Sequence, residues 1–177
     1  MDNKKKLPKI LILTIVLSIT SILLLVISIL TSYGTVKRTE NAIANIGTVT
    51  FEAETEEKID IAKNYYANLD TNIGLEKNVS NKDELDDAIY NYVRLGIKKA
   101  IVSYNRRIVD NVSEADIKIY VNDAYTKLKK YYEEKDFENI EGYSEFKALL
   151  DVYKEEKKES NNTTNPNPGT TEEPEIC

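Results

Sequence analysis

The apolar and polar positions of the chain separate one long apolar run from a series of amphipathic segments. Residues 10–30 contain no charged side chain. A helix of this length, rising about 1.5 Å per residue, spans roughly the 30 Å hydrocarbon core of a bilayer. Its polar residues are Ser and Thr, whose hydroxyls can donate to helix carbonyls. The run therefore predicts a single transmembrane helix.

The flanks of this run predict its orientation. Lys4, Lys5, Lys6 and Lys9 precede it, and basic flanks stay on the cytoplasmic side. We expect a basic cytoplasmic segment over 1–9, an uncleaved signal anchor in the plasma membrane, and the rest of the chain outside. A cleaved signal peptide is the alternative. Its apolar core is normally about 7–15 residues and ends at a small-x-small site, whereas this run is longer and 30–34 offer a poor site.

Residues 31–54 predict a short connection to the next part of the chain. A juxtamembrane turn is expected first, followed by a short helix that carries Val36, Ile43 and Ile46. Gly47 is expected to stop this helix. Val49 and Thr50 then form a short extended connector.

Residues 55–158 predict a helical bundle outside the membrane. Thr55 is expected to cap the first helix, which breaks at 70–74. Ser80 with Asp83, and Ser113 with Asp116, match capping boxes that open the next two helices. A last helix begins near Ser144 and dissolves after Tyr153. The positions expected to face the core recur at helical spacing and are Ile59, Ala62, Tyr66, Leu69, Leu85, Ala88, Ile89, Tyr92, Val93, Ile97, Ala100, Ile101, Tyr104, Ile108, Ile117, Val121, Ala124, Leu128, Phe146, Leu149, Leu150 and Tyr153.

The predicted fold class is therefore all-α: a transmembrane helix, an extracytoplasmic three- or four-helix bundle, and a disordered tail over 159–177. The tail is rich in Pro, Asn, Thr and Glu and has few apolar residues. Such a segment cannot offset the entropy of ordering its backbone.

Composition narrows the chemistry available to the chain. There is no His and only one Cys, so a histidine proton shuttle, a cysteine zinc cluster and an internal disulfide are excluded. The net charge of −6 argues against binding a phosphate backbone. The acidic clusters at 82–87 and 133–138 lack the alternating oxygen ligands and the Gly of a calcium loop. We expect solvated carboxylates there, with no catalytic residue, metal or cofactor.

Tyrosine is the most informative residue type, with twelve in the chain. Tyr65, Tyr90 and Tyr120 fall outside the apolar stripes and are candidate partner contacts, since exposed Tyr is favoured at interfaces. Tyrosine as a general large core residue is the alternative. Cys177 is a candidate for a disulfide with another chain, and an incidental cysteine is the alternative.

Residues 42–95 resemble a helical module of Firmicute-type membrane-anchored and cell-surface proteins. The module reads Ile-Gly-x-Val-Thr, then I-x-x-A-x-x-x-Y-x-x-L, V-x-N and L-x-x-A. The matching positions are Ile46, Gly47, Val49, Thr50, Ile59, Ala62, Tyr66, Leu69, Val79, Asn81, Leu85 and Ala88. The resemblance implies a spacer or binding module and supplies no catalytic residues.

Three functions fit these observations. The first is a non-enzymatic single-pass bacterial envelope protein that displays a helical bundle for protein or cell-wall contact. The second is a membrane-bound regulatory or assembly subunit of an envelope complex, which an exposed apolar or Tyr-rich face would favour. The third is an extracytoplasmic hydrolase with paired carboxylates, which would need a deep acidic pocket.

Overall fold

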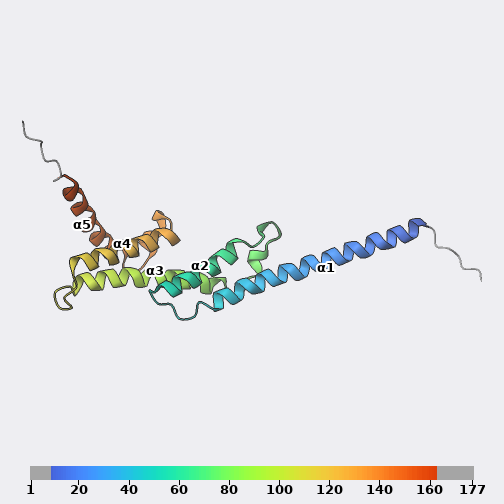
Figure 1. The fold of residues 1–177 in the computed structure, drawn as a ribbon, viewed down its shortest axis with the longest axis horizontal. Helices are drawn as coiled ribbons and strands as arrows, with labels where there is room; N and C mark the ends of the chain where they lie inside the picture. The colour runs from blue at the N-terminus through green and yellow to red at the C-terminus, as the bar shows by residue number, and fades with distance from the viewer. Residues whose placement is uncertain (1–8, 163–177) are drawn as a thin grey trace, which may run out of the picture. The chain divides into compact units, whose positions relative to one another are not determined.

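The computed structural model describes residues 9–162, with side chains through Tyr153 (Figure 1). Its helices are α1 (Lys9–Ala44), α2 (Ala53–Ala67), η1 (Thr71–Ile73), η2 (Leu75–Asn78), α3 (Lys82–Asn105), α4 (Glu114–Tyr131), η3 (Glu134–Asn139) and α5 (Tyr143–Asn162), where η denotes a 3-10 helix. No strand occurs within 9–162, so the all-α prediction is confirmed for this part of the chain. Most of the predicted tail, including Cys177, lies outside the described residues.

The chain divides into two compact units, with the boundary inside α3. Unit 1 comprises Met1–Tyr92 and unit 2 comprises Val93–Cys177. Each unit is described by itself below. The single bundle predicted over 55–158 therefore stays a prediction.

The first element of unit 1 is one uninterrupted helix. α1 is 36 residues long, so the turn predicted just after residue 30 is wrong. Hydroxyls of Thr31 and Thr35 donate to carbonyls of the preceding turn, at 3.0 Å from Ile27 O and 2.8 Å from Ser32 O. The hydroxyls of these polar residues are thus hydrogen-bonded within the helix, which continues through them. α1 is long and apolar enough to cross a membrane, and its apolar side chains over 10–30 are exposed.

The later part of α1 packs into the core of unit 1. Val36, Thr39 and Ile43 are buried, and α1 packs mainly against α2. The other buried core side chains of the unit are Ile46, Ile59, Ala62, Leu69, Val79, Leu85, Ala88 and Tyr92. Gly47 adopts a left-handed φ of 64° just after α1, as expected of a residue that ends a helix.

The prediction that Thr55 caps α2 is wrong. The helix begins two residues earlier, at Ala53, and its N-cap residue Glu52 makes no side-chain cap hydrogen bond. Thr55 is buried, and its hydroxyl oxygen lies 3.0 Å from that of Thr50 and accepts from the Thr50 amide at 3.4 Å. The hydroxyl thus fixes the connector between α1 and α2.

Unit 2 follows the predicted helical pattern most closely. Ser113 accepts a hydrogen bond from the Asp116 amide at 3.1 Å, which confirms the cap of α4. The stripe of Ile117, Val121, Ala124 and Leu128 is buried. On α5, Phe146, Leu149, Leu150 and Tyr153 are also buried. The other buried side chains of this unit are Val93, Ile97 and Ala100 of α3, together with Phe137 and Ile140.

The end of α5 differs from the prediction. The helix continues through Asn162, whereas we expected it to dissolve after Tyr153 and the disordered tail to begin at residue 159. Residues 159–162 are therefore helical, because the Lys- and Glu-rich sequence before them favours helix.

Candidate functional site

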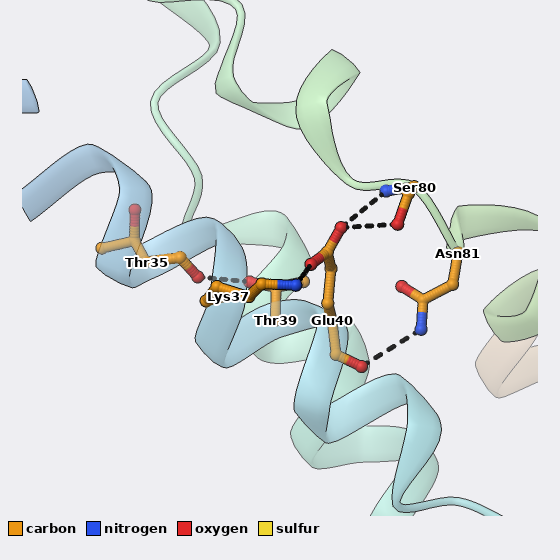
Figure 2. Close-up of polar contacts among 6 residues, drawn as sticks. All are labelled: Thr35, Lys37, Thr39, Glu40, Ser80 and Asn81. Carbon is orange, nitrogen blue, oxygen red and sulfur yellow. Dashed lines mark hydrogen bonds and ion pairs between the residues drawn. The ribbon is translucent and has the colours of Figure 1, made fainter. Parts of the chain in front are cut away.

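The first polar site lies in unit 1, where α1 meets the segment that leads into α3 (Figure 2). The Glu40 carboxylate accepts hydrogen bonds from the Ser80 hydroxyl at 2.6 Å and the Ser80 amide at 3.0 Å. It also pairs with Lys37 at 2.8 Å. Asn81 donates to the Glu40 carbonyl at 3.1 Å. We call these four residues the Glu40 cluster.

This cluster corrects the predicted cap of α3. The helix begins at Lys82, so Ser80 lies too early to cap it, and its hydroxyl bonds to Glu40 instead. A carboxylate that receives two donors from one residue and one from a lysine is a stronger partner than a helix amide. The partner lies 40 residues earlier in the chain, so sequence reasoning could not find it.

The electrostatics of the Glu40 cluster indicate a structural role. The hydrogen bond from Lys37, and then those from Ser80, lower the pKa of Glu40 from 4.5 to about 2. The same bond raises the pKa of Lys37. Both groups are therefore charged at neutral pH, and a carboxylate with so low a pKa is a poor proton donor or acceptor there. The cluster holds α1 to the chain before α3.

The second site is the loop of residues 106–113 in unit 2, which we call the α3–α4 loop. Ile108 and Val109 at its centre are 87% and 80% exposed. The prediction that Ile108 faces the core is wrong. α3 ends at Asn105, so the helical spacing on which that prediction depended does not reach Ile108.

The α3–α4 loop is ordered by its own hydrogen bonds. The Asp110 amide donates to the Arg106 carbonyl at 2.9 Å, and the two side chains form an ion pair at 3.0 Å. The Val112 amide donates to the Arg107 carbonyl at 3.0 Å. Asn111 adopts a φ of 50°, a conformation that Asn tolerates better than most residues. Ile108 and Val109 are therefore presented on a defined backbone.

A small groove of about 200 Å³ begins directly before this loop. Its lining residues are Ile101, Tyr104, Asn105, Glu145, Ala148, Leu149 and Val152. The guanidinium of Arg107 lies 4.2 Å from the centre of the Tyr104 ring. Asn105 donates to Glu145 at 3.1 Å on the groove edge. Tyr104, expected inside the core, is only half-buried and belongs to this surface.

The three Tyr residues predicted as contacts do not form one site. Tyr65 and Tyr90 belong to unit 1, and Tyr120 belongs to unit 2. Tyr65 is 37% exposed, with Arg38 at 5.9 Å from its ring centre. Tyr90 and Tyr120 are half-buried, and Lys99 lies 4.9 Å from the Tyr120 ring centre. Their role as partner contacts stays a prediction.

The exposed pair Ile108–Val109 is the feature that sequence reasoning missed. The sequence did contain a local indication of this exposed pair. Two large apolar residues lie between Arg106-Arg107 and Asp110-Asn111, in the segment that separates two helices. The acidic clusters give no comparable site. Among the side chains described, which run from residue 9 to 153, no group of three or more acidic, His or Cys residues could hold a metal ion.

Comparison of the chain with protein-family models, with curated proteins and with solved structures gives no match. The resemblance of residues 42–95 to a surface-protein module therefore stays a prediction, and the functional argument depends on the geometry of the two sites above.

Proposed function

We propose that this chain is a non-enzymatic, single-pass bacterial envelope protein that binds a protein partner through the α3–α4 loop. The observation that carries the proposal is the exposure of Ile108 and Val109 side by side on an ordered loop. This surface favours the assembly-subunit form of the function over a plain spacer.

The energetics of association support this surface. Burying two adjacent branched apolar side chains lowers the free energy of association, and a partner that covers both buries them in one contact. The loop is already fixed by the Arg106–Asp110 pair and by the amide of Val112. Binding therefore costs less conformational entropy than ordering a flexible loop would. The neighbouring groove offers a recess for a side chain of the partner.

The membrane part of the proposal is supported by α1. Its apolar residues 10–30 are exposed along the helix, which suits contact with lipid chains. The lysines before them favour a cytoplasmic N-terminus. The α3–α4 loop would then face the outside of the cell.

Proximity labelling of full-length protein in its native membrane tests this function. A double variant, Ile108→Asp with Val109→Asp, should lose the neighbours that wild type enriches, because two charges cannot be buried in an apolar contact. Ile61→Asp is the matched control, since Ile61 is also an exposed isoleucine but lies on α2 in unit 1.

The three chains should be compared at equal membrane levels and with equal helical content by circular dichroism. Retention of every neighbour by the double variant would falsify the proposed contact. Loss of the same neighbours with Ile61→Asp would also contradict it, because the effect would then not belong to the loop.

A further inference from the structure

The segment of η1 and η2, residues 71–78, lies along α1. At its later end, Ser80 is bonded to Glu40 (Figure 2). At its earlier end, Ile73 and Leu75 line a cavity of about 570 Å³ together with Ile29 and Tyr33 of α1. Along a helix, Ile29 and Glu40 are separated by about 16 Å at 1.5 Å per residue. The segment therefore extends from the Glu40 cluster back to the last turn of the apolar run.

Ile73 is the last residue of η1 and lines the cavity beside α1. Its side chain is nevertheless 62% exposed. The turn that carries it is ordered, because Asp70 accepts from the Asn72 amide at 2.9 Å and from the Leu75 amide at 3.1 Å. Gly74 follows with a φ of 70°, a conformation suited to glycine. An ordered turn thus exposes a large apolar side chain beside the end of α1's apolar run.

We propose that residues 71–78 contact the outer interface of the lipid bilayer and that Ile73 inserts among the lipids. This inference rests on the proposed membrane span of α1. Ile29, which lines the same cavity as Ile73, belongs to the charge-free run. Tyr33, one turn later, is 64% exposed, and tyrosine is favoured at the level of lipid headgroups.

The polarity of the cavity fits an interface rather than bulk water. Its apolar side chains are Ile29, Val36, Ile73 and Leu75, and Ser28, Ser32 and Asn78 contribute hydroxyl and amide groups among them. Lys37 and Glu40 line it further along α1, where they neutralise each other as an ion pair. A lipid headgroup region likewise brings apolar and polar groups together over a short distance. The mixed lining, continuous with the apolar run of α1, therefore favours lipid as the occupant.

Single-Trp variants test the inference directly, because the chain contains no Trp. Full-length Ile73→Trp, Leu24→Trp and Ile61→Trp are reconstituted in phosphatidylcholine–phosphatidylglycerol vesicles, without brominated lipid and with lipids brominated either near the headgroup or deeper in the acyl chain. Leu24 is an exposed residue of the apolar run, and Ile61 is an exposed isoleucine of the same unit on α2. All three positions are exposed, so the substitutions leave the core intact, which circular dichroism checks.

The expected result is strong quenching of Leu24→Trp and no quenching of Ile61→Trp. Ile73→Trp should emit at shorter wavelength than Ile61→Trp and be quenched severalfold more. If Leu24→Trp is quenched and Ile73→Trp is not, the span stands and the interfacial contact is overturned. A short-wavelength emission from Ile73→Trp without quenching would show a protein surface over Ile73, such as a second copy, and would also overturn it. If Leu24→Trp itself is not quenched, the proposed membrane span fails and this inference fails with it.

Discussion

Glu40 shows how one residue can join distant parts of the chain. Its carboxylate accepts two hydrogen bonds from Ser80 and pairs with Lys37, while its carbonyl accepts from Asn81. Hydrogen bonds to an ionised group are stronger than those between neutral groups. The contact therefore depends on the charge of Glu40.

Acid should weaken the Glu40 cluster. The pKa of Glu40 is lowered to about 2 in the folded protein from 4.5, so its stabilising contribution is present above pH 4.5 and is lost as the pH falls toward 2. We expect the hydrogen-exchange protection factor of the Ser80 amide to decrease over that range. In Glu40→Gln the protection should be low already at pH 6 and should vary less with pH.

The Asp116 amide provides the control for this measurement. It bonds to Ser113 in unit 2, so Glu40→Gln should leave its protection unchanged. An identical pH profile for Ser80 in wild type and Glu40→Gln would show that another group controls the contact.

Two glycines with positive φ form a natural comparison. Gly47 has a φ of 64° and open space where a Cβ would lie. Gly142 has a φ of 85°, and its Cβ would lie 3.4 Å from Ile97 Cγ2 and 3.6 Å from Ile101 Cδ1. Alanine in the left-handed region costs roughly 1–2 kcal/mol at either position. Gly142→Ala and Gly47→Ala should therefore lower the free energy of unfolding by similar amounts, because the contacts of 3.4 Å and 3.6 Å at Gly142 are ordinary van der Waals distances that displace no neighbour.

Denaturant unfolding of the full chain in detergent, followed by circular dichroism, measures this difference. A clearly larger loss for Gly142→Ala would contradict this expectation and would mean that Ile97 has to move to admit the methyl group.

At the scale of helices, the sequence predicts those features that depend on interactions between residues close in the chain. α4 is the clearest case: its Ser113 cap lies three residues from Asp116, and its buried stripe repeats within a single helix. The buried positions on α5 follow for the same reason. Periodicity and capping are readable in such segments because all partners are near in sequence.

The errors have a common physical cause, which is competition from more distant or more cooperative interactions. Ser80 matches the sequence pattern of a helix cap, but its hydroxyl forms a hydrogen bond with Glu40 instead. Likewise, the hydroxyl of Thr55 forms a hydrogen bond with that of Thr50. The turn expected near Gly34 is absent, since helix propagates readily once formed. Ile108 continues the stripe of α3 in sequence, but the helix ends before it. The exposed surface at Ile108 was therefore missed, because helical spacing was extended beyond the end of α3.

The core of unit 2 should depend on the α4 stripe. Leu128 is fully buried and Ile119 is exposed on the same helix. Leu128→Ala should lower the free energy of unfolding by about 2–5 kcal/mol, because it removes apolar contacts and leaves a cavity. Ile119→Ala should change it by no more than about 0.5 kcal/mol.

Chemical denaturation of both variants in the same detergent compares them. A small effect of Leu128→Ala would mean that the neighbouring side chains collapse into the space left behind.

At the scale of the whole molecule, the distribution of charge predicts the orientation of the chain across the membrane. Four lysines lie before the apolar run, and the net charge of the whole chain is −6. We expect the single Cys177 to react with a membrane-impermeant maleimide in intact, mildly reduced cells. Permeabilisation should not increase the labelling, since the proposed orientation places this end of the chain outside the membrane.

A cysteine at the other end of the chain gives the control. Asn3→Cys in a Cys177→Ser background should be labelled only after permeabilisation. The reverse pattern for the two thiols would contradict the proposed orientation.

The continuity of α1 has a mechanical consequence. Each residue turns an α-helix by about 100°, and no break separates residues 10–30 from Glu40. The angular position of Glu40 about the helix axis is therefore set by the rotational setting of the apolar run. A rotation of that run about its own axis would turn Glu40, Ser80 and the attached η1 and η2 segment in step. One residue inserted after Leu30 would likewise redirect this surface by about 100°.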